Sequence, residues 1–218
     1  MTKLLVATGY RSGTGQLASV EVVNLDNSNP DLNCENLPDF PFGIKFATGQ
    51  LFNRKTPIIC GGLASGSHCE CHSLKDGAWQ SINSLNECRD ALASAVFSNP
   101  NNNEGDDILL ITGGYDGSTT LSTVESFDGN VWSQTMFADL LTSIQGHCMV
   151  KINNTMLLQI GGTIDNSYDG TTDKTYFFDI ILNEWIAGPK LNVGRIYHSC
   201  AVMNWMNPET DSVEKVRD

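Results

Sequence analysis

Residues 108–114 read ILLITGG, and this stretch decides the fold. Its apolar run shows no polar alternation, which predicts a strand that is buried on both faces. The two glycines that end the run allow a positive φ or a close approach of another backbone. The stretch therefore predicts a short strand enclosed between two neighbouring layers.

The same pattern recurs along the chain. Gly61-Gly62 and Gly161-Gly162 end apolar runs as Gly113-Gly114 does, and Thr8-Gly9 is a weaker copy. The second residues of these four pairs are separated by 53, 52 and 48 residues. Regular spacing of this length predicts structural units that repeat about every 50 residues.

Three tryptophans repeat with the same period. Trp79, Trp132 and Trp185 follow one another at steps of 53 residues, and Cys34 takes the matching place in the first unit. This ordered combination resembles the kelch repeat family across nearly the whole chain. The resemblance implies an all-β fold, a kelch β-propeller of four-stranded antiparallel blades. Its glycines and tryptophans would have structural roles.

The repeat also predicts the domain organisation. Residues 1–218 form one kelch-repeat region, with blade-like units of about 1–53, 54–104, 105–153 and 154–205 and a polar linker at 206–218. Kelch propellers generally have five to seven blades, and an open arc would leave exposed strand edges. We therefore expect an incomplete propeller of about four blades, with four-bladed closure as the alternative.

Charge restricts the classes of partner. The formal net charge of −12 disfavours nucleic acids and anionic membranes. No apolar run approaches the ~20 residues of a membrane span. These properties leave a protein or peptide ligand as the expected partner.

The resemblance also points to partner-contacting residues. In kelch propellers the loops after the diglycine strands usually bind the partner, and Tyr10 and Tyr115 begin two such loops. An arginine after the blade tryptophan often faces the central pocket, which implicates Arg89 and Arg195. Gly43 and Ile144 take the corresponding places elsewhere, so we expect no continuous arginine ring. We predict partner contacts at Tyr10, Arg89, Tyr115 and Arg195.

Several functions fit this resemblance. The preferred one is an interaction module, either the substrate-recognition part of a cullin ubiquitin ligase adaptor or an extracellular kelch protein. The adaptor requires BTB and BACK domains upstream and would be cytoplasmic, whereas the extracellular version requires an upstream signal peptide. Actin binding is a further alternative. The enzymatic alternatives are a copper radical oxidase using His147 and His198, and a sugar-processing enzyme. We expect no enzyme, catalytic residue, metal or cofactor.

Cysteines and one sequon complete the predictions. The seven cysteines are an odd number, so at least one thiol is free or pairs with another chain. Cys60 can pair across a hairpin with Cys69 or Cys71. The flanking His68 and His72 would share the opposite face of a strand, which argues against one metal ion. Asn153 opens an Asn-Asn-Thr glycosylation sequon.

Overall fold

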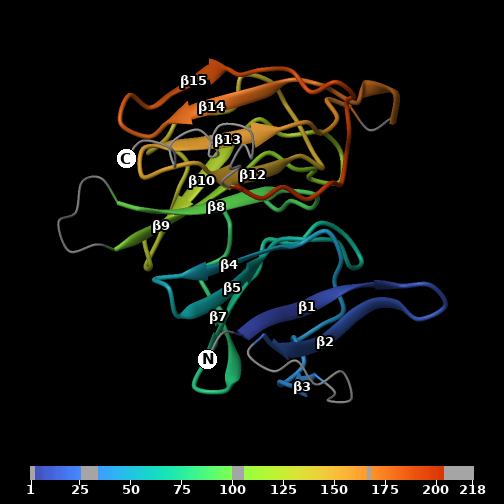
Figure 1. Cartoon of the computed structure of the whole chain (residues 1–218). Coiled ribbons are helices and arrows are strands. Elements are labelled where there is room, and N and C mark those ends of the chain that lie inside the picture. Colours follow the sequence, from blue (N-terminus) through green and yellow to red (C-terminus); the bar gives the residue numbers. More distant parts are fainter. Residues whose placement is uncertain (1–2, 26–33, 100–105, 166–167, 204–218) are drawn as a thin grey trace, which may run out of the picture.

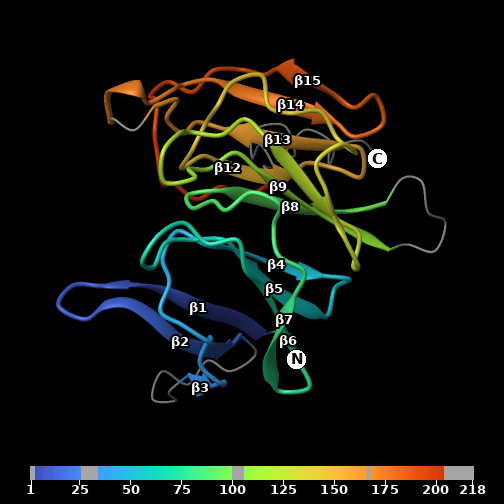
Figure 2. The ribbon, with the colours of Figure 1, turned by 180° about the vertical axis from the view of Figure 1, so that it is seen from behind.

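The computed structural model describes residues 3–25, 34–99, 106–165 and 168–203. Its strands form four antiparallel sheets that follow one another in chain order (Figures 1 and 2). The first sheet holds β1 (Lys3–Arg11), β2 (Gly15–Asn24) and β3 (Glu35–Asn36), and the second β4 (Thr48–Phe52), β5 (Thr56–Cys60), β6 (Cys71–Lys75) and β7 (Ala78–Ile82). The third holds β8 (Ala93–Ser98), β9 (Asp107–Thr112), β10 (Val124–Phe127) and β11 (Trp132–Ser133). The fourth holds β12 (Cys148–Lys151), β13 (Met156–Ile160), β14 (Thr175–Asp179) and β15 (Glu184–Ala187), with a 3₁₀ turn at Tyr168–Gly170.

The blades are offset by one strand from the units expected from the sequence. Each expected unit ends with a small-residue strand, and β4, β8 and β12 are three of these strands. Each of them pairs with the diglycine strand that follows it in the chain, so it belongs to the next blade. Links of three and four residues join β4 to β5 and β12 to β13, whereas 11 and 14 residues separate β4 and β12 from the strands of the preceding blades.

The first blade differs from the expectation of four strands. It has three strands within the described residues, and β1 is the diglycine-type strand at its edge. The predicted linker at 206–218 lies outside the described part of the chain.

The apolar core lies between neighbouring blades, as the sequence predicted. Residues 108–111 of β9 are at most 1% exposed. Ile108 and Leu110 pack in a cluster with the fourth blade, whereas Leu109 and Ile111 pack in a cluster with the second. Alternate residues of one strand therefore supply two interblade cores, which explains why the run needs no polar positions.

Each repeated tryptophan joins its blade to the preceding one. The indole N–H of Trp79 donates to the Pro38 carbonyl at 3.0 Å, that of Trp132 to Asn83 at 2.7 Å, and that of Trp185 to Ala138 at 3.0 Å. Trp185 is 9% exposed, and Trp79 and Trp132 are half-buried. Each indole thus contributes a hydrogen bond between its own blade and the connector that leads from the preceding one.

The diglycines bind the connectors between blades. Gly61, Gly62, Gly113, Gly114, Gly161 and Gly162 all have positive φ. The second glycine of each pair donates its N–H at 2.8 Å to a connector carbonyl, that of Arg89, Ile144 or Arg195, and Gly9 donates to Ile44 in the same way. Ile44, and not Gly43, is therefore the equivalent of Arg89 in the first connector.

Candidate functional site

The loop face is the end of the molecule formed by the loops after β1, β5, β9 and β13 and by the four connectors. Each connector carries one residue with a left-handed backbone, two positions after the residue that binds the glycine: Phe46, Ala91, Gly146 and Tyr197, with φ of 58°, 52°, 61° and 56°. Their backbones form a chain of hydrogen bonds. Ala91 donates to Phe46 at 3.0 Å, Gly146 to Ala91 at 2.7 Å and Tyr197 to Gly146 at 2.8 Å.

An aromatic cluster stands on this face. The rings of Phe46 and Tyr197 stack with centroids 5.0 Å apart and an interplanar angle of 14°. The Lys45 ammonium lies 5.1 Å from the ring centroids of both Phe46 and Tyr10. Tyr10, Phe46 and Tyr197 are 61%, 40% and 46% exposed. We call Tyr10, Lys45, Phe46 and Tyr197 the aromatic patch.

The patch contains one of the four residues predicted from the sequence. Tyr10 lies near the end of β1, opposite Gln16 of β2. The sequence did not reveal Phe46 and Tyr197, because they lie in the first and fourth connectors and come together only in the folded chain. Their shared place, two residues after the glycine-binding residue, is the signal that could have found them.

Tyr115 lies in a different part of the loop face. Its backbone exchanges hydrogen bonds of 2.8 and 2.9 Å with Asp90, and the Ser67 hydroxyl donates to its carbonyl at 3.1 Å. Its side chain is half-buried. Burial raises the pKa of Asp90, while the Ser67 hydrogen bond and the charge of Lys45 oppose this rise. Tyr115 thus joins neighbouring loops, and its role in partner contact stays a prediction.

The prediction of partner contact at Arg89 is wrong, because its side chain is 0% exposed. Its guanidinium donates to the Glu125 carboxylate at 2.8 Å, to Glu87 at 3.1 Å and to the Gly113 carbonyl at 2.9 Å. Burial lowers the pKa of Arg89, and the two carboxylates oppose this change. The side chain of Arg89 therefore binds groups of the third blade and is buried away from a partner.

Arg195 takes the equivalent place in the fourth connector but is exposed. Its Nε donates to the Val193 carbonyl at 3.3 Å. It lies in the same connector as Tyr197, and partner contact through its side chain stays a prediction.

The candidate histidines have internal contacts. His147 is 5% exposed and its Nε2 lies 2.9 Å from the Thr112 hydroxyl. Burial, assisted by the charge of His198, lowers the pKa of His147 to about 3. His68 pairs with Glu70 at 2.8 Å and stacks on Phe42. No group of three or more potential metal ligands occurs within the described ranges of the chain.

Six of the seven cysteines form disulfides. Cys60 and Cys71 are directly opposed residues of β5 and β6, with Cα atoms 4.2 Å apart. Cys69 bonds Cys88, and Cys148 bonds Cys200. Cys34 is free and exposed. Of the two pairings considered for Cys60, the structure contains that with Cys71.

The sequon residue Asn153 lies in the exposed turn between β12 and β13. Its side-chain oxygen accepts hydrogen bonds from the Thr155 N–H at 2.8 Å and the Thr155 hydroxyl at 3.1 Å. Glycosylation at this position stays a prediction. Among the described residues, no helix is long and apolar enough to cross a membrane.

Comparison with known proteins supports the repeat assignment. Residues 103–135 match the Kelch motif. The chain is 30% identical over 153 residues to "Spermatocyte protein spe-26" of Caenorhabditis elegans, a match that covers 67% of this chain and 24% of that protein. The chain thus corresponds to about a quarter of this curated relative.

A solved structure, "Structure of YjhT", has a similar fold. It superposes with a TM-score of 0.68 at 14% sequence identity, covering 87% of this chain and 63% of that one. Together with the repeated diglycines, the interblade tryptophans and the antiparallel blades, these similarities identify the chain as a member of the kelch-repeat β-propeller family.

Proposed function

We propose that the chain binds a protein or peptide partner through the aromatic patch on its loop face. The observation that carries this proposal is a cluster of three exposed rings from the β1 end and two separate connectors: Tyr10 and Phe46 lie beside the Lys45 ammonium, and Tyr197 stacks on Phe46. Exposed aromatic residues supply much of the binding energy of protein interfaces.

The patch is held in place before any partner arrives. Phe46 and Tyr197 keep left-handed backbones that cost non-glycine residues about 1–2 kcal/mol each. The same left-handed position recurs in all four connectors, and backbone hydrogen bonds between these positions fix Phe46 and Tyr197 to the scaffold. Because the stacked rings are already ordered, binding would lose little side-chain entropy.

The chemistry of the patch indicates what it would recognise. The ring faces favour an apolar or aromatic side chain, and the Lys45 ammonium favours a carboxylate beside it. We therefore expect a peptide segment that carries an apolar anchor next to an acidic residue.

A peptide-selection experiment tests this function. Random peptides displayed on phage are selected on the purified chain, and the Kd of the selected peptide is measured by calorimetry. The Phe46→Gly/Tyr197→Gly variant removes both rings while keeping residues that accept positive φ. We expect its Kd to rise at least tenfold. The control, Ile181→Ala/Leu182→Ala, changes two exposed side chains in the β14–β15 turn. An equal Kd for wild type and patch variant would refute the proposal.

Two settings for this binding function differ in redox state. The extracellular version is supported by the three disulfides, because such bonds persist in oxidising compartments. The ligase-adaptor version is supported by the kelch repeats alone and requires reduced cysteines. Mass spectrometry of the protein from its native source, alkylated at lysis, distinguishes the two.

A metal analysis tests the copper-oxidase alternative. Stoichiometric copper in the purified native protein would replace the binding proposal with an oxidase.

A further inference from the structure

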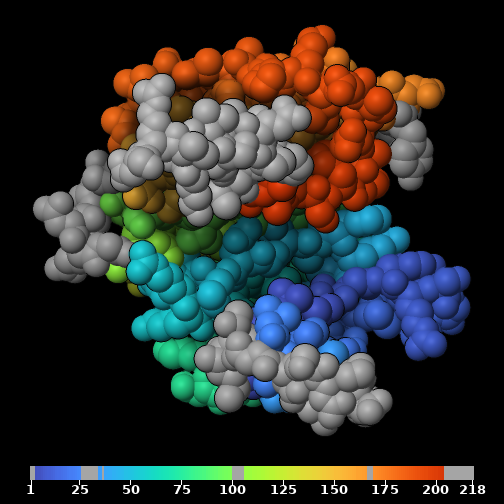
Figure 3. Space-filling view, in the orientation of Figure 1, coloured from blue at the N-terminus to red at the C-terminus, as the bar shows by residue number. Residues whose placement is uncertain are grey.

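A cavity of about 520 Å³ lies on the loop face at the fourth blade. The connector that enters this blade contributes Thr142 and Ile144 to its wall, β14 contributes Tyr176, and the rest comes from the β13–β14 loop and the next connector. Figure 3 shows the orange β13–β14 loop projecting from the fourth blade. Thr142 is exposed and Ile144 is 2% exposed, so the cavity extends from the surface to the core.

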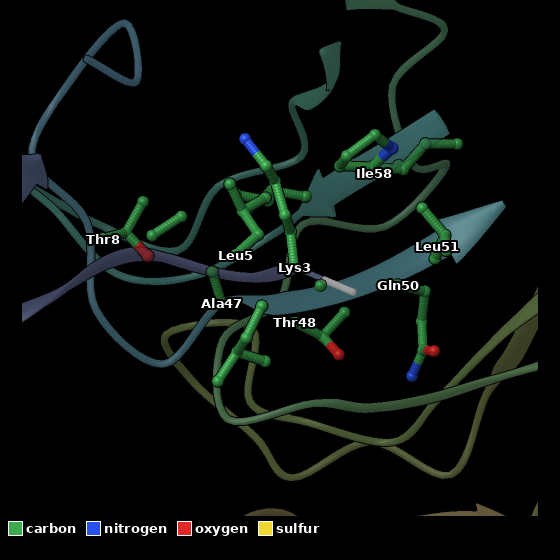
Figure 4. Close-up of a pocket in the computed structure, with 13 residues that line it drawn as sticks. Lys3, Leu5, Thr8, Ala47, Thr48, Gln50, Leu51 and Ile58 are labelled. Atoms are coloured by element: carbon green, nitrogen blue, oxygen red, sulfur yellow. The ribbon is translucent and has the colours of Figure 1, made fainter. Parts of the chain in front are cut away.

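Another cavity, of about 450 Å³, lies between the first two blades (Figure 4). Leu5, Ala47 and Ile58 are among its lining residues, most of which belong to the strands β1, β4 and β5. The cavity of the fourth blade differs from it, because loops and connectors supply most of the lining. These segments differ most from one repeat to the next, and they are where a scaffold carries specific contacts.

The second and third blades contain sites equivalent to this cavity. The entering connector supplies to each the residue whose carbonyl accepts from a glycine of the preceding blade: Ile44, Arg89 or Ile144. It also supplies the residue two positions earlier: Phe42, Glu87 or Thr142. The third strand of the blade supplies the residue opposite the second position before the diglycine: His72, Glu125 or Tyr176.

In the second blade an aromatic ring of the chain itself fills the site. Phe42 stacks on His68, with ring centroids 4.9 Å apart and an interplanar angle of 20°. It also meets the ring of His72 edge-on, at 5.7 Å between centroids. Both arrangements are favourable for aromatic pairs. Ile44 of the same connector is 1% exposed and belongs to the apolar cluster below.

In the third blade an ion cluster fills the site. The guanidinium of Arg89 donates to Glu125 at 2.8 Å and to Glu87 at 3.1 Å. It also donates to the Gly113 carbonyl at 2.9 Å. Two carboxylates and one carbonyl therefore satisfy this buried cation.

The fourth blade has the walls of the second blade without the ring. Ile144 repeats the isoleucine of the second blade, and the aromatic Tyr176 stands where His72 stands. Thr142 replaces Phe42, so a small side chain takes the place of a benzyl group. The cavity therefore lies where the second blade holds an aromatic side chain.

A guanidinium would lack its partners in this cavity. Thr142 and Tyr176 replace the two carboxylates of the third blade, and Lys174 adds a positive charge to the lining. The Gln159 amide already donates to the Gly161 carbonyl at 3.0 Å, the acceptor that the arginine uses in the third blade. The occupant that fits is an aromatic ring.

The outer rim of the cavity is polar. Asp169, Lys174 and Asn192 belong to the lining and are exposed, and the Asp173 carboxylate lies 3.4 Å from the Lys190 ammonium. A hydroxyl group can both donate to and accept from such groups. An aromatic ring with a hydroxyl at its outer end, the side chain of tyrosine, therefore matches both the walls and the rim.

We propose that this cavity is a binding slot for a tyrosine side chain of a protein or peptide partner. The tyrosine ring takes the place that Phe42 has in the second blade. The slot is distinct from the aromatic patch, because none of the four residues of the patch lines it. The inference therefore does not rest on the proposed function of the patch.

A set of peptides that differ in one side chain tests the slot. Acetyl-Gly-Tyr-Gly-amide, its arginine and alanine counterparts, and glucose are each titrated into the purified chain, and the amide NMR signals of residues 170–174 are followed. We expect the tyrosine peptide to shift these signals at least tenfold more than the others at equal concentration. No shift with the tyrosine peptide, or equal or larger shifts with the arginine peptide or glucose, would overturn the proposal.

Filling the slot from within gives a second test. Thr142→Phe introduces the residue that the second blade has at this position, and we expect the Kd of the tyrosine peptide to rise at least tenfold. The control, Leu141→Phe, adds a ring at an exposed neighbour outside the lining and should keep the wild-type Kd. Thr142→Leu, a smaller filling residue, provides the same test if Thr142→Phe does not fold. An unchanged Kd in a folded filling variant would refute the slot.

The patch variant keeps the two proposals apart. Phe46→Gly/Tyr197→Gly should leave the shifts of residues 170–174 unchanged, because it alters no lining residue. Loss of these shifts in the patch variant, with wild-type shifts in Thr142→Phe, would assign the tyrosine peptide to the patch and overturn the slot.

Discussion

The ring of Phe46 stacks on the ring of Tyr197, so the first connector of the propeller contacts the fourth. Backbone hydrogen bonds link successive connectors, and this stack links the fourth connector to the first, so the four connectors form one circle on the loop face. The stack also adds the exposed ring of Tyr197 to that of Phe46, which lies beside Lys45 in the aromatic patch where the binding function is proposed.

Arg89 is expected to be essential for stability. Arg89→Ala leaves the fully buried Glu125 carboxylate without its charged partner, which typically costs about 3–5 kcal/mol. Urea unfolding measures the loss. Lys55→Ala, at an exposed turn, serves as the control and should change stability by less than about 0.5 kcal/mol. Equal stability of both variants would contradict the buried ion pair.

The tryptophans should contribute according to their burial. Trp185→Ala removes a buried ring and is expected to cost about 3–5 kcal/mol, with a smaller loss for the half-buried Trp132→Ala. Trp185→Phe keeps most of the apolar area and loses the hydrogen bond to Ala138, so it should cost less than Trp185→Ala. Thermal unfolding of the three variants checks this order. An unchanged Tm for Trp132→Ala would contradict the blade assignment.

The buried His147 should make the protein less stable in mild acid. Burial lowers its folded pKa to about 3, below the ordinary value of 6.5, so the unfolded chain binds more protons between these values. Stability from this group is therefore present above pH 6.5 and is lost as the pH falls towards 3, by at most about 1.4 kcal/mol per pH unit. Burial also lowers the pKa values of His72 and His198, which adds losses of the same sign.

His147→Leu isolates this contribution, because Leu92 occupies the equivalent place in another connector. The variant should show a shallower fall of unfolding free energy between pH 6.5 and 5, whatever its absolute stability. An unchanged slope would mean that His147 has the same pKa in the folded and unfolded states.

Thiol labelling should modify one cysteine per native chain. Cys34 is exposed and unpaired, whereas the other six are in disulfides. A maleimide reagent without reductant should therefore add one label, located at Cys34 by peptide mapping, and Cys34→Ser should remain unlabelled. Labelling of several sites before reduction would contradict the disulfide pattern.

Asn153 should carry a glycan when the chain is produced in the secretory pathway. The turn exposes its side chain and sets Thr155 against it. We expect one glycosidase-sensitive mass increment that disappears in Asn153→Gln and remains in Asn154→Gln. A wild-type protein that lacks the increment would contradict the prediction.

The sequence by itself determined the repeat, the all-β class and the two-sided burial of the diglycine strands. Residues 108–111 show why: their burial is encoded in a run without polar positions, and the run recurs with the same flanking glycines. The same local pattern occurs in several repeats, and each copy supports the assignment of the others. The strands and the tryptophans between blades could therefore be predicted without knowing which blades are adjacent.

Only the tertiary structure decided which equivalent residues are available to a partner. Arg89 and Arg195 have the same place in the repeat, yet the first is buried against Glu125 of the adjacent blade and the second is exposed. Phe46 and Tyr197 likewise meet only when the connectors form a circle. Burial and pairing depend on side chains supplied by other blades, and the sequence of one repeat does not contain them.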